Sequence, residues 1–335
     1  MESPDHCGPE DCGPDALWLD AAARLSARGV TLARPNPSVG AIIVKDGMVV
    51  GRGWTQAGGR PHAEAMALAA AGPQAAGAVL YVSLEPCAHA SERGPSCCSL
   101  IRDSSISRIV AGCPDPDPRT AGKGIESLRS AGLSAELLPS TSCKASLAGY
   151  LTRARLGRPH VTLKLAMSAD GALARPPGES QWITSEASRA HVHAIRAKMD
   201  AILVGSGTLQ ADNPRLDVRL PGIEARSPQR WVLTRGAVPE GWQAVASPQA
   251  IGQIKDAQYL MVEGGAETAR AFLDAGLVDR LMIYRAPLTI AGDVPRLAEL
   301  TPTALAHSGK WQRTDSRTLG NDTLDVYEPM PCSPE

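Results

Sequence analysis

Residues 61–71 read Pro-His-Ala-Glu-Ala-Met-Ala-Leu-Ala-Ala-Ala, residues 83–87 read Ser-Leu-Glu-Pro-Cys, and Cys97 follows after nine more residues. The pattern predicts a helix that begins near His62 and a strand at 78–82 that ends shortly before Cys87. One histidine and two thiolates are good zinc ligands, and three protein ligands leave the fourth tetrahedral position open for water. The sequence therefore predicts a catalytic zinc site in an α/β domain.

Glu64 lies two residues after His62. In zinc deaminases, whose signature is His-x-Glu followed by Pro-Cys, this glutamate is not a ligand but shuttles protons. Zinc lowers the pKa of its bound water toward about 7, so hydroxide is available at neutral pH. We therefore expect hydrolytic loss of ammonia from a ring carbon, with Glu64 as the proton shuttle.

Other interpretations of these residues stay open. Taken singly, His62 is more often a solvated residue and Cys87 a small buried hydrophobe. Of the neighbours Cys97 and Cys98, we expect the first to bind zinc and the second to pack. A non-enzymatic protein in which zinc only stabilises the fold is one alternative, and such a site would need a fourth protein ligand. A nucleoside or nucleic-acid deaminase is a further alternative.

The regions around this pattern indicate a layered domain. Asp46-Gly47 separates two β-branched runs, which is a strong signal for a hairpin. Helix and strand then alternate, which predicts an α/β domain with a mixed sheet. The expected elements are a helix at 16–25, hairpin strands at 39–45 and 48–54, helices at 62–71, from 97 and at 122–131, and strands at 78–82, 108–112 and 135–138.

A second domain follows. The chain has 335 residues, a length typical of about two domains, and three arginines followed by proline at 151–159 predict a junction. We expect a first domain at 1–149 and a second at 150–335. The second has its own α/β pattern, with strands at 161–167, 201–204, 231–233, 259–262 and 281–284 and helices at 185–198 and 266–275.

Composition limits the class of protein. Hydrophobic residues make up 43% and charged residues 21%, and 34 basic residues nearly balance 35 acidic ones. Bulk charge therefore gives no reason to expect a nucleic-acid or membrane partner. The N-terminus has no secretory signal, and no apolar run approaches the roughly 18 residues of a membrane helix. We expect a cytoplasmic enzyme for a small molecule, with reduced cysteines. The sequence does not decide the oligomeric state, and a homo-oligomer stays open.

The first half resembles the bifunctional deaminase/reductases of riboflavin biosynthesis. The resemblance rests on residues 35–40, the excursion from Cys87 to Cys97, and residues 115–124. It implies a cytidine-deaminase-like three-layer α/β/α domain. It also implies a diaminopyrimidinone substrate with a ribosylamino 5′-phosphate, contacted by Asn36 and His89. From the residues alone, Asn36 could equally shape a proline-flanked turn and His89 a loop surface.

The glycine loops of the second half do not form a Rossmann fingerprint, because Gln210 replaces the third glycine after Gly205 and Gly207. Segments 164–171, 178–185, 200–219 and 263–281 instead resemble the reductase domain of the same family. That resemblance implies a dihydrofolate-reductase-like fold that uses NADPH to reduce ribosyl to ribityl. It places the cofactor against Ala166, Trp182, Thr208, Asp212, Gly265, Ala266, Glu267, Thr268, Ala269, Arg270 and Ala271, and the substrate against Ser180, Arg196, Leu216, Arg219 and Glu263.

Two arginines of this set, Arg196 and Arg219, suit a ribose phosphate because guanidinium matches phosphate oxygens with bidentate hydrogen bonds. Ordinary ion pairing is the alternative. The chain departs from the family pattern at Asn213, where the family often has Asp, and in a short segment at 221–258. A deaminase with an impaired reductase half therefore stays open as an alternative.

Overall fold

The computed structural model describes residues 13–176 and 182–330, which form two compact units, 1–157 and 158–335. In the first unit, five strands form one sheet in the order β2-β1-β3-β4-β5, with β1 antiparallel to β2 and β3 and with β3, β4 and β5 parallel. The strands are β1 (Gly40–Lys45), β2 (Met48–Trp54), β3 (Val79–Val82), β4 (Arg108–Ala111) and β5 (Ser134–Leu137).

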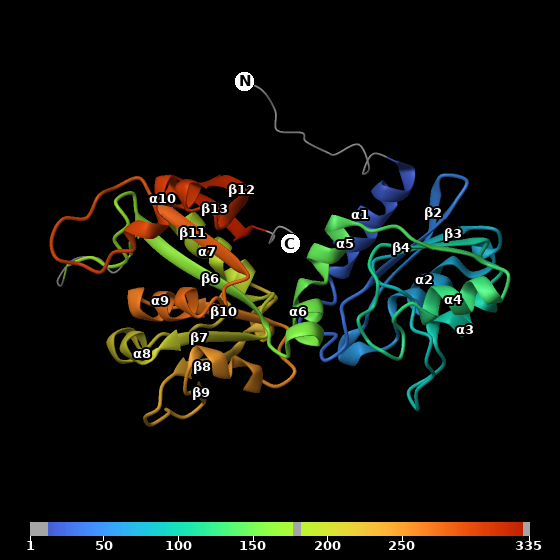
Figure 1. Ribbon diagram of the computed structural model, residues 1–335, viewed down its shortest axis with the longest axis horizontal. Coiled ribbons are helices and arrows are strands. Elements are labelled where there is room, and N and C mark those ends of the chain that lie inside the picture. The colour runs from blue at the N-terminus through green and yellow to red at the C-terminus, as the bar shows by residue number, and fades with distance from the viewer. Residues whose placement is uncertain (1–12, 177–181, 331–335) are drawn as a thin grey trace, which may run out of the picture. The chain divides into compact units, whose positions relative to one another are not determined.

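The predicted hairpin is confirmed. Asp46 and Gly47 join β1 to β2, and both have a positive φ, 51° and 76°, as the favoured two-residue hairpin turn requires. Helices cover both faces of the sheet, with α1 and α5 on one and α2, α3 and α4 on the other (Figure 1), so the three-layer prediction is confirmed. The helices are α1 (Pro14–Ser26), α2 (Ala63–Ala71), α3 (Cys97–Arg102), α4 (Lys123–Ser130), α5 (Thr141–Ser146) and α6 (Ala148–Leu156).

Helix α2 lies unusually close to strand β2. A Cβ atom at Gly53 would lie 2.1 Å from the carbonyl oxygen of Ala63, and one at Gly51 would lie 2.3 Å from that of Ala67. Only glycine permits such an approach, because any side chain would push the helix away from the sheet. The two glycines therefore determine how close α2 lies to the sheet. His62 and Glu64, at the start of α2, are positioned by this contact.

The second unit contains an eight-stranded sheet in the order β12-β13-β11-β6-β10-β7-β8-β9. Strands β11, β6, β10, β7, β8 and β9 are parallel, and the β12–β13 hairpin is antiparallel at one edge. The strands are β6 (His160–Ser168), β7 (Ala201–Gly205), β8 (Gln229–Leu233), β9 (Gln243–Val245), β10 (Tyr259–Glu263), β11 (Arg280–Ala286), β12 (Trp311–Leu319) and β13 (Asp322–Pro329).

Two apolar clusters of the second unit contain residues from neighbouring strands and different helices. Phe272 of α9 belongs to the cluster with Leu163 and Leu260, whereas Val192 of α7 belongs to the cluster with Ile202 and Met261. Since side chains alternate between the faces of a strand, the two helices cover opposite faces. The helices are α7 (Glu186–Arg196), α8 (Ser206–Asp212), α9 (Ala266–Asp274) and α10 (Pro302–Ser308).

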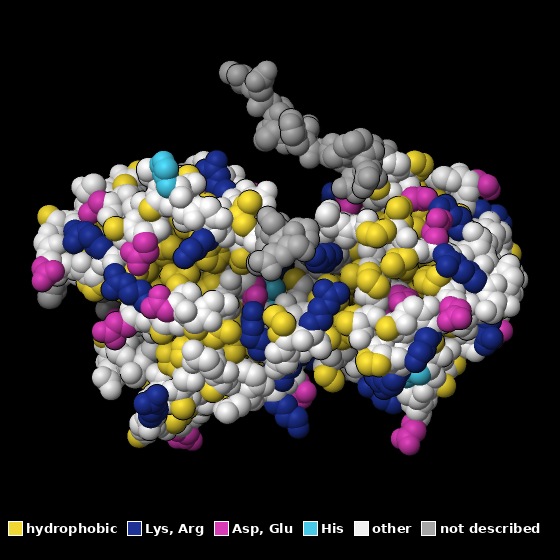
Figure 2. Space-filling view, viewed as in Figure 1, with side chains coloured by type: hydrophobic (Ala, Val, Ile, Leu, Met, Phe, Trp, Pro, Cys, Tyr) yellow, Lys and Arg dark blue, Asp and Glu magenta, His cyan; other side chains and the backbone are white. Residues whose placement is uncertain are grey.

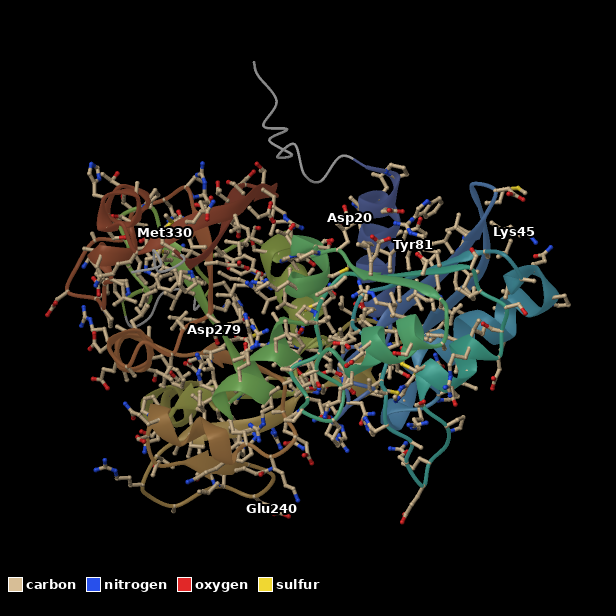
Figure 3. The ribbon with its side chains drawn as sticks, turned by 45° about the vertical axis from the view of Figure 1, so that its right-hand side comes forward. Asp20, Lys45, Tyr81, Glu240, Asp279 and Met330 are labelled. Atoms are coloured by element: carbon tan, nitrogen blue, oxygen red, sulfur yellow. The ribbon has the colours of Figure 1, made fainter. Side chains whose placement is uncertain are left out.

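Ion pairs also hold the second unit together. Arg158, just before β6, donates two hydrogen bonds to Asp279 at 2.6 and 2.9 Å. Asp279 is labelled in Figure 3. On the face seen in Figure 2, acidic and basic side chains are interspersed over this unit. Among the described residues, no helix combines the length and apolar character needed to cross a membrane.

Candidate active sites

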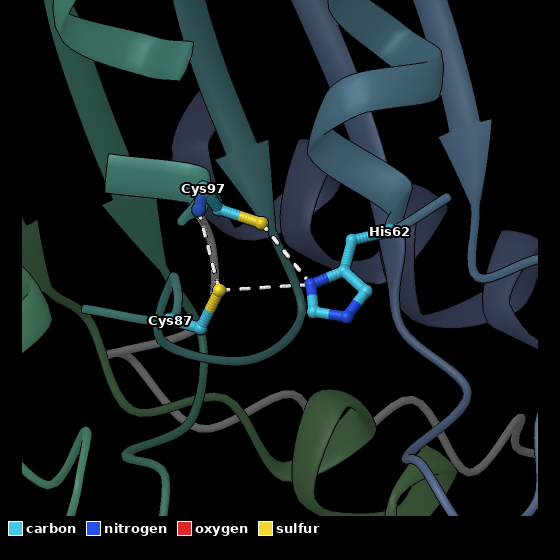
Figure 4. Close-up of side chains that lie close together, drawn as sticks. All are labelled: His62, Cys87 and Cys97. Atoms are coloured by element: carbon cyan, nitrogen blue, oxygen red, sulfur yellow. Dashed lines mark hydrogen bonds between the residues drawn. The ribbon is translucent and has the colours of Figure 1, made fainter. Parts of the chain in front are cut away.

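His62, Cys87 and Cys97 meet in the first unit, as the sequence predicts. Their potential ligand atoms all lie within 4.8 Å of one another, with His62 Nδ1 3.2 Å from Cys97 Sγ and 3.6 Å from Cys87 Sγ (Figure 4). Within residues 13–176 and 182–330, they are the one group of three or more potential ligand residues. Three ligands of this kind are typical of a catalytic zinc site rather than a structural one.

Local structure explains why the three side chains converge. His62 is the N-cap of α2, and Cys97 is the first residue of α3, whose N-cap Ser96 accepts a hydrogen bond from the Ser99 amide. Cys87 follows the end of β3, and the backbone amide of Cys97 donates to its Sγ at 3.2 Å. Two helix starts and one strand end therefore meet at a single point.

The two thiols differ in their affinity for protons. The hydrogen bond from Cys97 lowers the pKa of Cys87 to about 4, and the same bond raises the pKa of Cys97. Cys98 is turned elsewhere: its Sγ lies 3.5 Å from the carbonyl oxygens of Pro86 and Gly124, and burial raises its pKa to about 12. Thus Cys98 does not join the group, and it packs as we expected.

Glu64 is 3% exposed, and burial raises the pKa of its carboxyl group. It lines a cavity of about 360 Å³ beside His62 and Cys87, together with the predicted substrate contacts Asn36 and His89. A raised pKa favours the exchange of protons that a general acid–base group performs. Nine further polar residues line the same cavity without having been assigned to the site from the sequence, namely Thr55, Arg60, Glu85, Ser91, Arg93, Asp115, Asp117, Arg119 and Tyr150.

Asp115 and Tyr150 form one wall of this cavity. The Tyr150 hydroxyl donates to Asp115 Oδ1 at 2.8 Å, and burial raises the pKa of Asp115. Asp115 begins the segment 115–124, which is one of the segments on which the family resemblance rests. Tyr150 comes from α6, 35 residues later. Only the first of these two residues carried any signal in the sequence.

In the second unit, the glycine loops that follow β7 and β10 lie side by side. The Gly265 amide donates to Thr208 Oγ1 at 3.3 Å, and a Cβ atom at Gly205 would lie 2.2 Å from Thr268 Oγ1. The loops adjoin because β7 and β10 are neighbouring parallel strands, whose carboxyl ends share one edge of the sheet. Open α/β sheets bind ligands outside that edge.

The other expected cofactor residues are placed as follows. Trp182 is 56% exposed, and the guanidinium of Arg189 lies 4.8 Å from its ring centroid. Ala166 is in β6 next to β10, and Asp212 ends α8 with an exposed side chain. Ser180 lies outside the described residues.

The expected substrate residues Arg196 and Glu263 form a bidentate ion pair at the end of β10. Arg196 donates from Nε at 2.8 Å and Nη2 at 3.0 Å, and Lys164 Nζ lies 3.7 Å from the same carboxylate. Burial opposes the charge of Glu263, but Lys164 and Arg196 outweigh it and hold its pKa below the usual value. Arg219 is 54% exposed and pairs with Asp217 at 3.3 Å.

Leu216, the remaining expected substrate residue, is buried, with a φ of 53°. A positive φ is unusual for a branched residue. It places a backbone kink directly before Asp217, whose carbonyl oxygen accepts a hydrogen bond from Arg196 Nη1 at 3.1 Å.

Fold and site together define a zinc-dependent deaminase joined to a reductase. The family model for the cytidine and deoxycytidylate deaminase zinc-binding region matches residues 14–113, and that for the RibD C-terminal domain matches residues 159–324. The chain belongs to the RibD family of bifunctional riboflavin biosynthesis enzymes, whose deaminase uses zinc and whose reductase uses NADPH.

The relatives match over almost their whole length. The riboflavin biosynthesis protein RibD of Escherichia coli is 35% identical over 92% of this chain and 97% of its own. That of Haemophilus influenzae is 34% identical over 94% and 97%. The solved structure of Acinetobacter baumannii RibD has a TM-score of 0.83 and 32% identity, covering 94% of this chain and 99% of its own. A Thermotoga maritima diaminohydroxyphosphoribosylaminopyrimidine deaminase/5-amino-6-(5-phosphoribosylamino)uracil reductase also has a TM-score of 0.83, at 28% identity and with 94% and 98% covered.

Proposed function

We propose that the first unit deaminates a diaminopyrimidinone that carries a ribosylamino 5′-phosphate, and that the second reduces the ribosyl group of the product. The observation that supports the first step best is the meeting of His62, Cys87 and Cys97 beside the buried Glu64 in one cavity. The substrate is the one named for the Thermotoga maritima relative. The cavity suits it because Arg60 and Arg93 add positive charge to its lining.

The donor set fits zinc, since one imidazole and two thiolates, one of them with a pKa lowered to about 4, are groups that zinc prefers. Bound zinc supplies a water that ionises near neutral pH. Glu64 takes up a proton and returns one to the ring nitrogen or the departing amine, so that oxygen replaces nitrogen and ammonia leaves. Asn36 and His89 hold the pyrimidine in the cavity.

For the second step, we assign NADPH to the adjoining loops after β7 and β10, and we include Trp182 among the residues that would hold it. When bound there, NADPH would supply the hydride that, together with a proton from solvent, converts C1′ of the open-chain or imine form of the sugar to the ribityl product, leaving NADP⁺. Arg219 is exposed and binds the phosphate, whereas Arg196 is occupied by Glu263 and holds that carboxylate in place. Ser180 and Leu216 complete the assigned substrate site.

We also propose a cytoplasmic enzyme that has no nucleic-acid partner, because the net charge of −1 provides no bulk attraction for a polyanion. Mass spectrometry of the pyrimidine substrate, incubated with the protein with and without NADPH, tests both steps. Without NADPH, we expect only the exchange of an amine for oxygen, and with NADPH a further gain of two hydrogens. If the pyrimidine stays intact while cytidine or tRNA is deaminated, the assignment is wrong.

The adjacent cysteines provide a test of the zinc ligands. Cys97→Ser should lose zinc and ammonia release, because a hydroxyl is a poor zinc ligand, whereas the reductase should continue to oxidise NADPH with the deaminated product. Cys98→Ser is the matched control, because a hydroxyl there can still donate to the Pro86 and Gly124 carbonyls. Metal analysis and ammonia release are measured on both variants. Equal zinc loss in the two would contradict the ligand assignment.

A further inference from the structure

Glu85 has no part in the chemistry above, yet its carboxylate is 3% exposed and fully hydrogen-bonded. Oε2 accepts from the backbone amides of Asp115 at 3.3 Å and Gly122 at 3.0 Å. Oε1 accepts from those of Gly124 at 2.9 Å and Ile125 at 3.3 Å. A buried carboxylate is tolerated where such donors replace water, and hydrogen bonds to a charged acceptor are the stronger kind. Both oxygens are therefore occupied by one neighbouring segment.

That segment runs into helix α4. Its N-cap is Gly122, which has a φ of 76° and no side chain to accept from the first amides of the helix. Glu85 supplies the missing acceptor and places negative charge at the positive end of the helix. The contact is close, because a Cβ atom at Gly124 would lie 2.2 Å from the carbonyl oxygen of Pro86. In addition, the Glu85 amide donates to the Cys113 carbonyl at 2.9 Å.

Both segments that these hydrogen bonds connect contribute residues to the lining of the deaminase cavity. On one side, Cys87 follows Glu85 by two residues and is a proposed zinc ligand. On the other, Asp115, Asp117 and Arg119 line the same cavity as the proposed ligands His62 and Cys87. The hydrogen bonds of the Glu85 carboxylate therefore connect the cavity-lining segment 115–119 to the segment after β3 that carries Cys87.

We propose that Glu85 is a positioning residue of the deaminase site. It fixes the position of the cavity-lining segment 115–119 relative to Cys87 and Glu64. This inference rests on the proposed deamination of the pyrimidine. It does not give Glu85 a role in proton transfer, because its four acceptor sites are filled by backbone amides. Its effect should therefore appear in substrate binding rather than in zinc content.

The test is Glu85→Gln, which has nearly the same shape but places an NH₂ group against two of the four amides. We expect the KM for the pyrimidine to rise about tenfold or more, which corresponds to about 1.4 kcal/mol of lost substrate binding. Zinc content and the reductase activity of the same chain, measured with the deaminated product, should stay unchanged. Glu126→Gln is the matched control, because Glu126 is an exposed glutamate in the first turn of the same helix.

The possible results distinguish a failure of the role given to Glu85 from a failure of the proposed deamination. If the KM is unchanged and activity falls only with the folded or zinc-loaded fraction, Glu85 is merely structural and the inference is overturned. If the wild-type protein does not release ammonia from the pyrimidine, the proposed function fails instead. Should the Gln variant not accumulate, Glu85→Asp keeps the charge on a shorter side chain that reaches fewer of the amides. The same KM rise is then expected, and wild-type kinetics would overturn the inference.

Discussion

The Glu64→Gln variant should lose deamination of the pyrimidine by at least about a thousandfold, within the range that general acid–base catalysis contributes. The amide cannot take up a proton, although it fills the same buried space beside His62. Zinc content should stay at the wild-type level, since the proposed ligands are unchanged. Ammonia release and metal analysis measure the two effects separately.

The control for this variant is Glu92→Gln, which removes an exposed carboxylate from the loop between Cys87 and Cys97. It should deaminate like the wild type. The reductase half provides a second control, because NADPH oxidation with the deaminated product should be unaffected in both variants. Substantial deamination by zinc-loaded Glu64→Gln protein would contradict the assigned proton shuttle.

The Arg196→Met variant should lose reductase activity by about a hundredfold, because Glu263 would no longer be held in place and a misplacement of about 1 Å can cost about a hundredfold in rate. Glu263, 11% exposed, would keep only Lys164 at 3.7 Å. We also expect the second unit to lose about 3 kcal/mol of unfolding free energy, since a buried charge is left poorly compensated. NADPH oxidation and urea unfolding measure these losses.

Arg215→Met makes the same chemical change at a position that is 77% exposed and pairs with Asp217. Surface ion pairs contribute at most about 1 kcal/mol, so its stability and NADPH oxidation should remain near the wild type. Deamination should be unchanged in both variants. If Arg196→Met reduces the substrate normally, Arg196 does not hold Glu263 for the reaction.

Regular patterns made much of the fold predictable. The hairpin at 40–54 follows from Asp46-Gly47, and the parallel strands follow from short apolar runs that are buried on both faces. Strand β12 was missed because none of its residues is buried and only every fourth one is half-buried, so that no apolar period of two marks it. Helix α8 was missed because none of its side chains is buried.

The cavity of the first unit was predictable only in part. His62, Glu64 and Cys87 lie in short motifs whose chemistry depends on residue type and spacing. The wall residues come from distant segments, and Tyr150 reaches Asp115 only after α5 and α6 have folded back. Such convergence depends on tertiary packing, which no local pattern encodes. The same limit applies to Arg196 and Glu263, where resemblance indicated the residues but not their ion pair.

Strand β12 forms one end of the eight-stranded sheet, and its charged side chains include the exposed Arg313 and Arg317 and the half-buried Asp315. An edge strand offers unpaired amides and carbonyls to any extended chain that meets it, which is a common route to aggregation. Three charged side chains along this edge oppose such strand addition, since each would lose water against the incoming chain. We therefore expect this edge strand, which carries little apolar signal in the sequence, to disfavour the edge-to-edge association of one copy of the enzyme with another.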